Sequence, residues 1–203
     1  MAIAFVQKAQ GESLDTTLNL TITGVAAGNF IAVTGSINST TRTLSVADDR
    51  GNTYTATAAS PQRSGTAESE NGKGYIWYAL NVAAGTTIVT ITKSSAGATL
   101  EGAAHEYSDV ATTAALDVQA GLGGDTGQPD SGNVTTTVAD ELLFGFTFTP
   151  ANGRTYSADT SYTLRVQQPT GANLGKHGTE DQIVTVTGTY SAGPNLNTTT
   201  NWG

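Results

Sequence analysis

Apolar and polar residues alternate along most of the chain, and this repeat of two predicts β-strands and leaves almost no stretch for a helix. The alternation is clearest in Leu18–Ile22 and Ile183–Thr187, where one face is apolar and the other polar. The run Leu142–Phe148 is apolar on both faces at its start, which predicts a strand in the middle of a sheet. The whole pattern predicts strands at Ala2–Ala9, Leu14–Thr23, Asn29–Ile37, Thr43–Ala47, Thr53–Ala58, Gly74–Val82, Thr86–Thr92, Ala98–Ser108, Leu116–Ala120, Gly132–Val138, Glu141–Thr149, Tyr162–Gln168, Gln182–Tyr190 and Leu196–Trp202.

Three longer polar segments lie between the predicted strands, at Ser60–Lys73, Leu122–Ser131 and Pro169–Thr179. Each is rich in Gly, Ser, Asn or Pro, and long loops on a rigid β scaffold are where binding residues usually lie. The same composition also suits a surface connector with no partner, so both interpretations stay open for each loop.

The number of strands and the Gly-rich turns predict an all-β fold, an antiparallel two-sheet β-sandwich of the jelly-roll type. Sandwiches of about this length commonly form one unit, so residues 1–203 are expected to form a single β-sandwich domain. The alternative is a subdivision near residues 110–130, although no long Pro-rich or charged linker marks one there.

Charge and composition narrow the classes of partner. The formal net charge is −8, whereas nucleic-acid binding and attraction to anionic membranes both need clustered Lys and Arg. We therefore expect no nucleic acid and no membrane as a partner. The N-terminus has no basic segment followed by a long apolar core, so no signal peptide is expected. The chain has no cysteine, which excludes disulfides and thiolate metal sites.

Residues suited to catalysis are few. His105 lies in a predicted strand, and the neighbouring Glu106, if buried, is expected to bond backbone N–H groups or an Arg in a structural role. His177 falls in a predicted loop, where a solvated side chain is expected. No nucleophile elbow, zinc-protease motif or complete phosphate loop is present. We predict no catalytic residues, no cofactor and no enzyme; a glycosidase with two carboxylates is the enzymatic alternative, and no pair can be named for it.

Calcium is the one metal that the sequence leaves open. Carboxylates occur in pairs, and Ca²⁺ needs six to eight oxygen ligands from several such groups. No calcium-loop motif is present, so turn capping and solvated charge are the competing interpretation. The pairs are Asp48 with Asp49, Asp125 with Asp130, and Glu180 with Asp181.

Aromatic side chains are the remaining candidates for binding, because sugar-binding sandwiches stack sugar rings on exposed Trp or Tyr. Trp77 is expected in the core, where large aromatic residues anchor sandwiches. Tyr156 and Tyr162 flank a polar loop and are expected to be exposed, and Trp202 is expected to cap a core edge or enter a subunit contact. The candidate ligand or partner contacts are therefore Tyr156, Tyr162, His177 and Trp202.

A set of motifs in a fixed order resembles a widespread group of bacterial and bacteriophage β-sandwich domains. The group occurs in phage structural proteins and in large extracellular bacterial proteins, and the resemblance covers about Val6 to Trp202. The motifs mark turns and core positions and carry no catalytic residue. They are Ser45-Val46-Ala47-Asp48, Gly51-Asn52-Thr53-Tyr54, Ile76-Trp77-Tyr78-Ala79-Leu80-Asn81-Val82, Glu106-Tyr107-Ser108, Leu116-Asp117-Val118, Ser131-Gly132-Asn133-Val134-Thr135-Thr136-Thr137, Glu141-Leu142-Leu143-Phe144-Gly145 and Glu180-Asp181.

The resemblance implies a non-enzymatic virion structural protein, such as a capsid decoration, spike or tail-attached protein, that acts through protein–protein contacts. Its expected partners are other virion or coat subunits, including copies of itself in a homo-oligomer, and its expected location is a virion surface or the extracellular space. The alternative is a carbohydrate-binding module or adhesin that binds glycans. In the group the final strand runs several apolar residues past the Trp, whereas here it stops at Trp202-Gly203, so it is shortened or its place is taken by another subunit.

Overall fold

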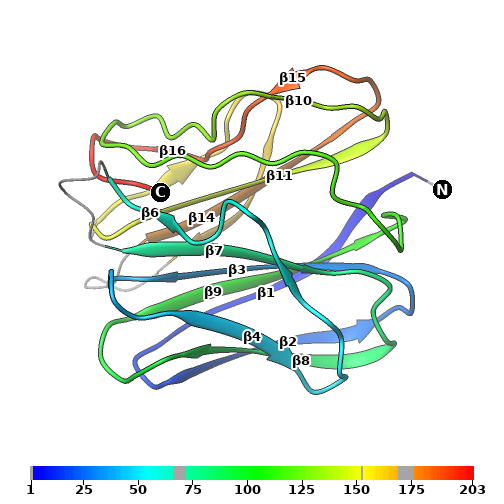
Figure 1. Cartoon of the computed structure of the whole chain (residues 1–203), viewed down its shortest axis with the longest axis horizontal. Coiled ribbons are helices and arrows are strands. Elements are labelled where there is room, and N and C mark those ends of the chain that lie inside the picture. The colour runs from blue at the N-terminus through cyan, green and yellow to red at the C-terminus, as the bar shows by residue number, and fades with distance from the viewer. Residues whose placement is uncertain (1, 66–71, 152, 169–175) are drawn as a thin grey trace.

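The computed structural model describes residues 2–65, 72–151, 153–168 and 176–203, and its regular structure there consists of β-strands. Figure 1 shows three antiparallel sheets lying one above another, which we call the lower, central and upper sheets. Among these residues no helix has the length and hydrophobicity needed to cross a membrane. The prediction of an all-β antiparallel sandwich is confirmed.

The three sheets contain most of the strands. The lower sheet has the order β2-β8-β4, with β2 (Thr17–Val25), β8 (Gly85–Lys93) and β4 (Leu44–Asp48). The central sheet has the order β1-β9-β3-β7-β5, with β1 (Ala4–Ser13), β9 (Leu100–Ser108), β3 (Phe30–Ile37), β7 (Lys73–Ala79), β5 (Thr55–Ala56), and β6 (Gln62–Arg63) paired to β7. The upper sheet has the order β11-β14-β13, with β11 (Glu141–Thr149), β14 (Lys176–Val184) and β13 (Thr163–Gln168). Two short ladders join β10 (Val134–Thr135) to β15 (Thr189–Tyr190) and β12 (Tyr156–Ser157) to β16 (Asn195–Leu196).

The first half of the chain forms a jelly roll. Its long strands alternate between the central and lower sheets, so that β1-β9-β3-β7 faces β2-β8-β4. Side chains at every second position of these strands point between the two sheets and form the main apolar core. Ile31 and Val33 of β3 and Val89 and Ile91 of β8 are each fully buried there, and Trp77 is buried as expected.

The upper sheet covers the opposite face of the central sheet. Its strand β11 can approach closely because Gly74 of β7 has no side chain: a Cβ there would lie 2.5 Å from the ring of Phe148 and 2.7 Å from that of Phe146. The central sheet is therefore buried on both faces, by an apolar layer below and by the upper sheet above.

Several strand predictions in the second half of the chain are corrected by this arrangement. Leu116–Ala120 is not a strand, because its backbone has no strand partner within the described residues. The run Leu142–Phe148 lies in β11, whose predicted bounds match the structure, but among the described strands β11 pairs only with β14 and is therefore an edge strand. The predicted strand Gln182–Tyr190 divides into the end of β14 and the short β15.

Two isoleucines on β8 give a matched test of the core. Ile91 is fully buried and Ile88 is 37% exposed on the opposite face of the same strand. We expect Ile91→Ala to lower the free energy of unfolding by about 2–5 kcal/mol, because a cavity remains in the core. Ile88→Ala is the control and should change it by about 0.5 kcal/mol or less. Urea unfolding of both variants checks this, and equal losses would contradict the assigned strand faces.

Candidate functional site

A layer of hydrogen-bonded polar side chains joins the central sheet to the upper sheet. His177 of β14 is fully buried, and both nitrogens of its ring face hydroxyl groups of β3. Nε2 lies 2.7 Å from Thr34 Oγ1, and Nδ1 lies 3.1 Å from Ser36 Oγ. The same ring packs against Phe146, with the ring centroids 4.6 Å apart. Polar bonds and aromatic packing therefore hold β14 against β3.

The layer continues along β9. His105 Nε2 lies 2.9 Å from Thr179 Oγ1, and the His105 ring packs edge-on to Phe144. Tyr107 donates its hydroxyl proton to Asp181 Oδ2 over 2.5 Å. Asp181 is also paired with Arg165 of β13, whose Nε lies 2.8 Å from the same oxygen. Each inward-facing polar residue of β14 thus has a partner on a neighbouring strand.

Burial changes the protonation of this layer. Loss of solvation lowers the pKa of both His105 and His177 to about 3, so both rings are neutral at neutral pH. Burial, together with the neighbouring Asp181 carboxylate, raises the pKa of Tyr107. Neutral rings that bond to hydroxyl groups place no unpaired charge in the interior.

The polar layer has the residue types of a catalytic site but not the arrangement of one. A serine–histidine–acid triad needs the acid to hold one ring nitrogen while the other faces the serine. Here both nitrogens of His177 face hydroxyls, and Glu101 lies beside Ser36, with Oε2 3.4 Å from Ser36 Oγ. Because Thr34 and His177 are fully buried and Ser36 is 4% exposed, a substrate has no path to them. The arrangement suits the packing of the upper sheet on the central sheet.

Two further buried carboxylates have structural partners. Glu106 accepts hydrogen bonds from Asn29 Nδ2 at 2.6 Å, Gln7 Nε2 at 2.7 Å and the backbone N–H of Ala26 at 3.1 Å. The expectation of a structural Glu106 bonded to backbone N–H is confirmed. Glu180 accepts from two backbone N–H groups outside the upper sheet, and its burial raises its pKa.

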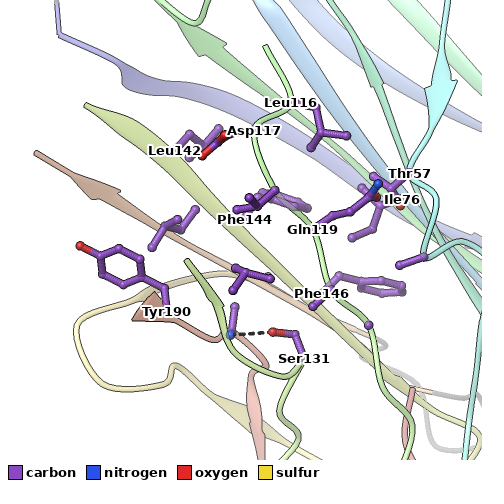
Figure 2. Close-up of a pocket in the computed structure, with 18 of the residues that line it drawn as sticks. Thr57, Ile76, Leu116, Asp117, Gln119, Ser131, Leu142, Phe144, Phe146 and Tyr190 are labelled. Carbon is purple, nitrogen blue, oxygen red and sulfur yellow. Dashed lines mark hydrogen bonds between the residues drawn. The ribbon is translucent and has the colours of Figure 1, made fainter. Parts of the chain in front are cut away.

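The second candidate site is a cleft of about 470 Å³ beside β11. Figure 2 shows its floor, where Phe144 and Phe146 of β11 lie near Ile76 of β7. Its outer wall is the segment 114–122, which runs over the opening and carries Leu116 and Gln119. Leu122, also on this wall, is 54% exposed. We call segment 114–122 the strap and the space between it and β11 the cleft.

Polar groups lie around the apolar lining of the cleft. Every charged residue among the described lining is acidic: Asp117, Asp130, Asp140 and Glu141. Asp117 accepts hydrogen bonds from the N–H and hydroxyl of Thr137, which lower its pKa. Burial and the nearby Asp117 raise the pKa of Glu141. The cleft thus combines an apolar interior with a negative rim.

The structure separates the four residues that the sequence singled out for binding. His177 is in β14 and fully buried, so the prediction of a solvated loop histidine is wrong. Tyr156 is 6% exposed and packs with Leu196 and Trp202 in a small second core, so its predicted exposure is also wrong. Tyr162 lines the cleft but donates its hydroxyl proton to the Ser191 carbonyl. Trp202 lines the cleft from that small core, which fits the expected cap of a core edge.

No group of three metal-ligating side chains occurs within residues 2–65, 72–151, 153–168 and 176–203. Two carboxylates of the proposed calcium pairs cap turns: Asp48 accepts from the N–H groups of Arg50 and Asn52, and Asp130 from that of Gly132. Asp181 is held by Tyr107 and Arg165. These contacts fit the turn-capping and structural interpretation for those three residues.

Sequence reasoning missed the residues that build the cleft. The sequence pattern predicts the middle of a sheet for Leu142, Phe144 and Phe146, and a strand for Leu116–Ala120. The sequence did contain a signal for the cleft, namely the apolar residues on both faces of Leu142–Phe148. A strand of this kind at a sheet edge needs another segment to cover its apolar side chains. No protein-family model, curated protein or solved structure matches this chain.

The buried histidines give an acid-dependent stability. The unfolded chain binds protons on His105 and His177 near pH 6.5, whereas the folded chain resists protonation down to about pH 3. The stability that they contribute is therefore complete above pH 6.5 and is lost as the pH falls towards 3. Within that window we expect each histidine to add about 1.4 kcal/mol per pH unit to the slope of unfolding free energy against pH.

The double variant His105→Gln, His177→Gln tests this, because the chain has only these two histidines. Glutamine keeps hydrogen-bonding groups in the layer but does not titrate. We expect urea unfolding between pH 3.5 and 6.5 to show a shallower slope for the variant, whatever its absolute stability. The carboxylates, including Glu180, contribute equally to both proteins. Parallel slopes would contradict buried neutral histidines.

Proposed function

We propose that this protein is a non-enzymatic structural component of a larger particle, such as a bacteriophage virion, and that it acts by protein–protein contact through the cleft. The observation that carries the proposal is the cleft itself: an apolar groove open beside a sheet edge. Binding sites are commonly concave and mostly apolar, with a few polar groups at the rim. The histidines, in contrast, are sealed inside the polar layer.

The rigidity of the scaffold supports a contact role. The central sheet is packed on both faces, and its interfaces are made of interlocked apolar side chains below and paired polar side chains above. A surface held by such a scaffold loses little conformational freedom on binding, which favours stable association. The low content of charged residues, 13%, and the net charge of −8 are compatible with a protein that works at high local concentration.

A second candidate function is carbohydrate binding, and one observation favours it. Tyr190, Ser131 and Gln119 line different parts of the cleft (Figure 2), and Tyr162 also lines it. Aromatic rings and hydrogen-bonding side chains in one cleft are the composition expected of a sugar site. The acidic rim and the apolar floor suit a polypeptide better than a polar glycan, so we rank this function second.

Co-sedimentation tests the proposed function. Particles purified by density gradient from the producing culture are expected to contain the protein, and stripped particles are expected to rebind added protein. Leu122→Glu places a charge on the cleft wall and should abolish rebinding. Val186→Glu is the matched control, because Val186 is 63% exposed and does not line the cleft.

The proposed function is contradicted if the protein is absent from every particle fraction, or if both variants rebind like the unmodified chain. Saturable binding of oligosaccharides by the free protein, with no particle association, would favour the second candidate. In a Trp77→Phe background Trp202 is the one remaining tryptophan, so its fluorescence would report sugar binding at the cleft.

A further inference from the structure

The backbone of β11 has an open edge where it borders the cleft. At the end of the strand, Phe148 and Gly203 exchange hydrogen bonds in both directions, at 2.9 and 3.1 Å. Phe148 therefore directs its N–H and C=O away from β14. Because backbone groups alternate sides along a strand, Phe146, Phe144 and Leu142 direct theirs the same way. Within the described residues no backbone hydrogen bond is made to these three on that edge.

The C-terminal residues already occupy the first position of a strand in this gap. Gly203 pairs with Phe148 of β11 on one side. On the other side, Trp202 forms an antiparallel bridge with Gly124, just past the strap, through bonds of 2.8 and 2.9 Å. A Cβ on Gly124 would lie 2.5 Å from the Trp202 ring, so a glycine is needed for this approach. Trp202-Gly203 thus lies between two segments to which it runs antiparallel.

A strand continuing this line would enter the cleft between β11 and the strap. It would pair with Phe146, Phe144 and Leu142 on one side and with the strap on the other (Figure 2). Two observations from the sequence agree with this position. Leu116–Ala120 has the pattern of a strand but has no strand partner in the described part of the chain. Leu142–Phe148 has the pattern of a central strand but lies at an edge of the described sheet. One further strand between Leu116–Ala120 and Leu142–Phe148 would explain both sequence patterns.

We propose that the cleft is the place of one added β-strand, donated by another protein subunit as an extended apolar segment followed by basic residues. This inference rests on the proposed function and names the chemistry of the partner. Backbone hydrogen bonds to an open edge give the affinity in such strand addition, and side-chain pockets give the specificity.

The lining sets the sequence of the donated segment. Residues directly opposite each other in a sheet share a face, so alternate donor residues would lie beside Phe146, Phe144 and Leu142 and pack towards Ile76 of the central sheet. These positions require apolar side chains. The donor would run antiparallel to β11, so its C-terminal end would lie beside Glu141, where β11 begins. It would leave the cleft there, where Asp117 and Asp140 also lie. Lys or Arg there would face the acidic rim.

A synthetic donor tests the proposal on the full chain. The probe is the peptide Thr-Val-Thr-Ile-Thr-Val-Lys-Lys with fluorescein at its C-terminal end, and binding is measured by fluorescence anisotropy. We expect saturable binding that is at least about tenfold weaker for a peptide with the same side chains but N-methylated at alternate residues, because it cannot complete the backbone bonds. We expect Glu-Glu in place of Lys-Lys to weaken binding about threefold or more at low salt.

Protein variants locate the binding. Leu122→Glu should weaken peptide binding, whereas Val186→Glu should leave it unchanged. Fusing the peptide sequence directly after Gly203 should fill the cleft within one chain and block the labelled peptide. The melting temperatures of the variants show whether each is folded.

Strand addition is overturned if the N-methylated peptide binds equally well, since that would indicate side-chain docking alone. It is also overturned if the fusion does not block the probe. If light scattering shows that a second copy of this chain fills the cleft and excludes the peptide, the proposed donor is wrong. Particle association that depends on the cleft but shows no peptide binding would reject strand addition and leave the proposed function intact.

Discussion

The hydrogen-bonded layer between β14 and the central sheet is the interaction on which the rest of the structure depends. The jelly roll places Thr34, Ser36, His105 and Tyr107 on the outer face of its central sheet, where they would otherwise face solvent. The inward-facing residues of β14 bury that face and form hydrogen bonds with these side chains, and burial holds both histidines neutral. Hydrogen bonds are directional, so they determine the position of the upper sheet more closely than apolar contacts alone would.

This fixed position has a consequence for β11. The upper sheet is anchored through β14, and β11 follows it with its outer edge directed into the cleft. A free sheet edge lined by apolar side chains is a hazard for aggregation unless it is covered or charged. In this protein the strap runs over the edge, and the acidic rim repels other acidic molecules, including further copies of a chain whose net charge is −8. The strap and the acidic rim thus limit unselective pairing at this edge, and the partner that we propose for it is a basic, extended segment.

The sequence predicted the jelly roll well and the upper half less well, for a physical reason. Period-two alternation is a local signal, and it identified β2, β3, β8, β9 and β11 within a few residues. It could not tell that Tyr156 and His177 would be buried, because their partners lie far along the chain. It also could not separate a central strand from an edge strand beside an empty position, since both have two apolar faces. Leu142, Phe144 and Phe146 have this two-faced apolar pattern, but the hydrogen-bond partners of β11 are needed to show that the strand lies at an edge.

Amide hydrogen exchange along β11 of the free protein tests the central claim, that this edge is an unpaired strand position, most directly. The account predicts that exchange alternates: the amides of Leu143, Gly145 and Thr147 bond to β14 and are protected, whereas those of Leu142, Phe144 and Phe146 exchange rapidly. Uniform protection of all six amides would show that the edge is already paired, and would contradict the account.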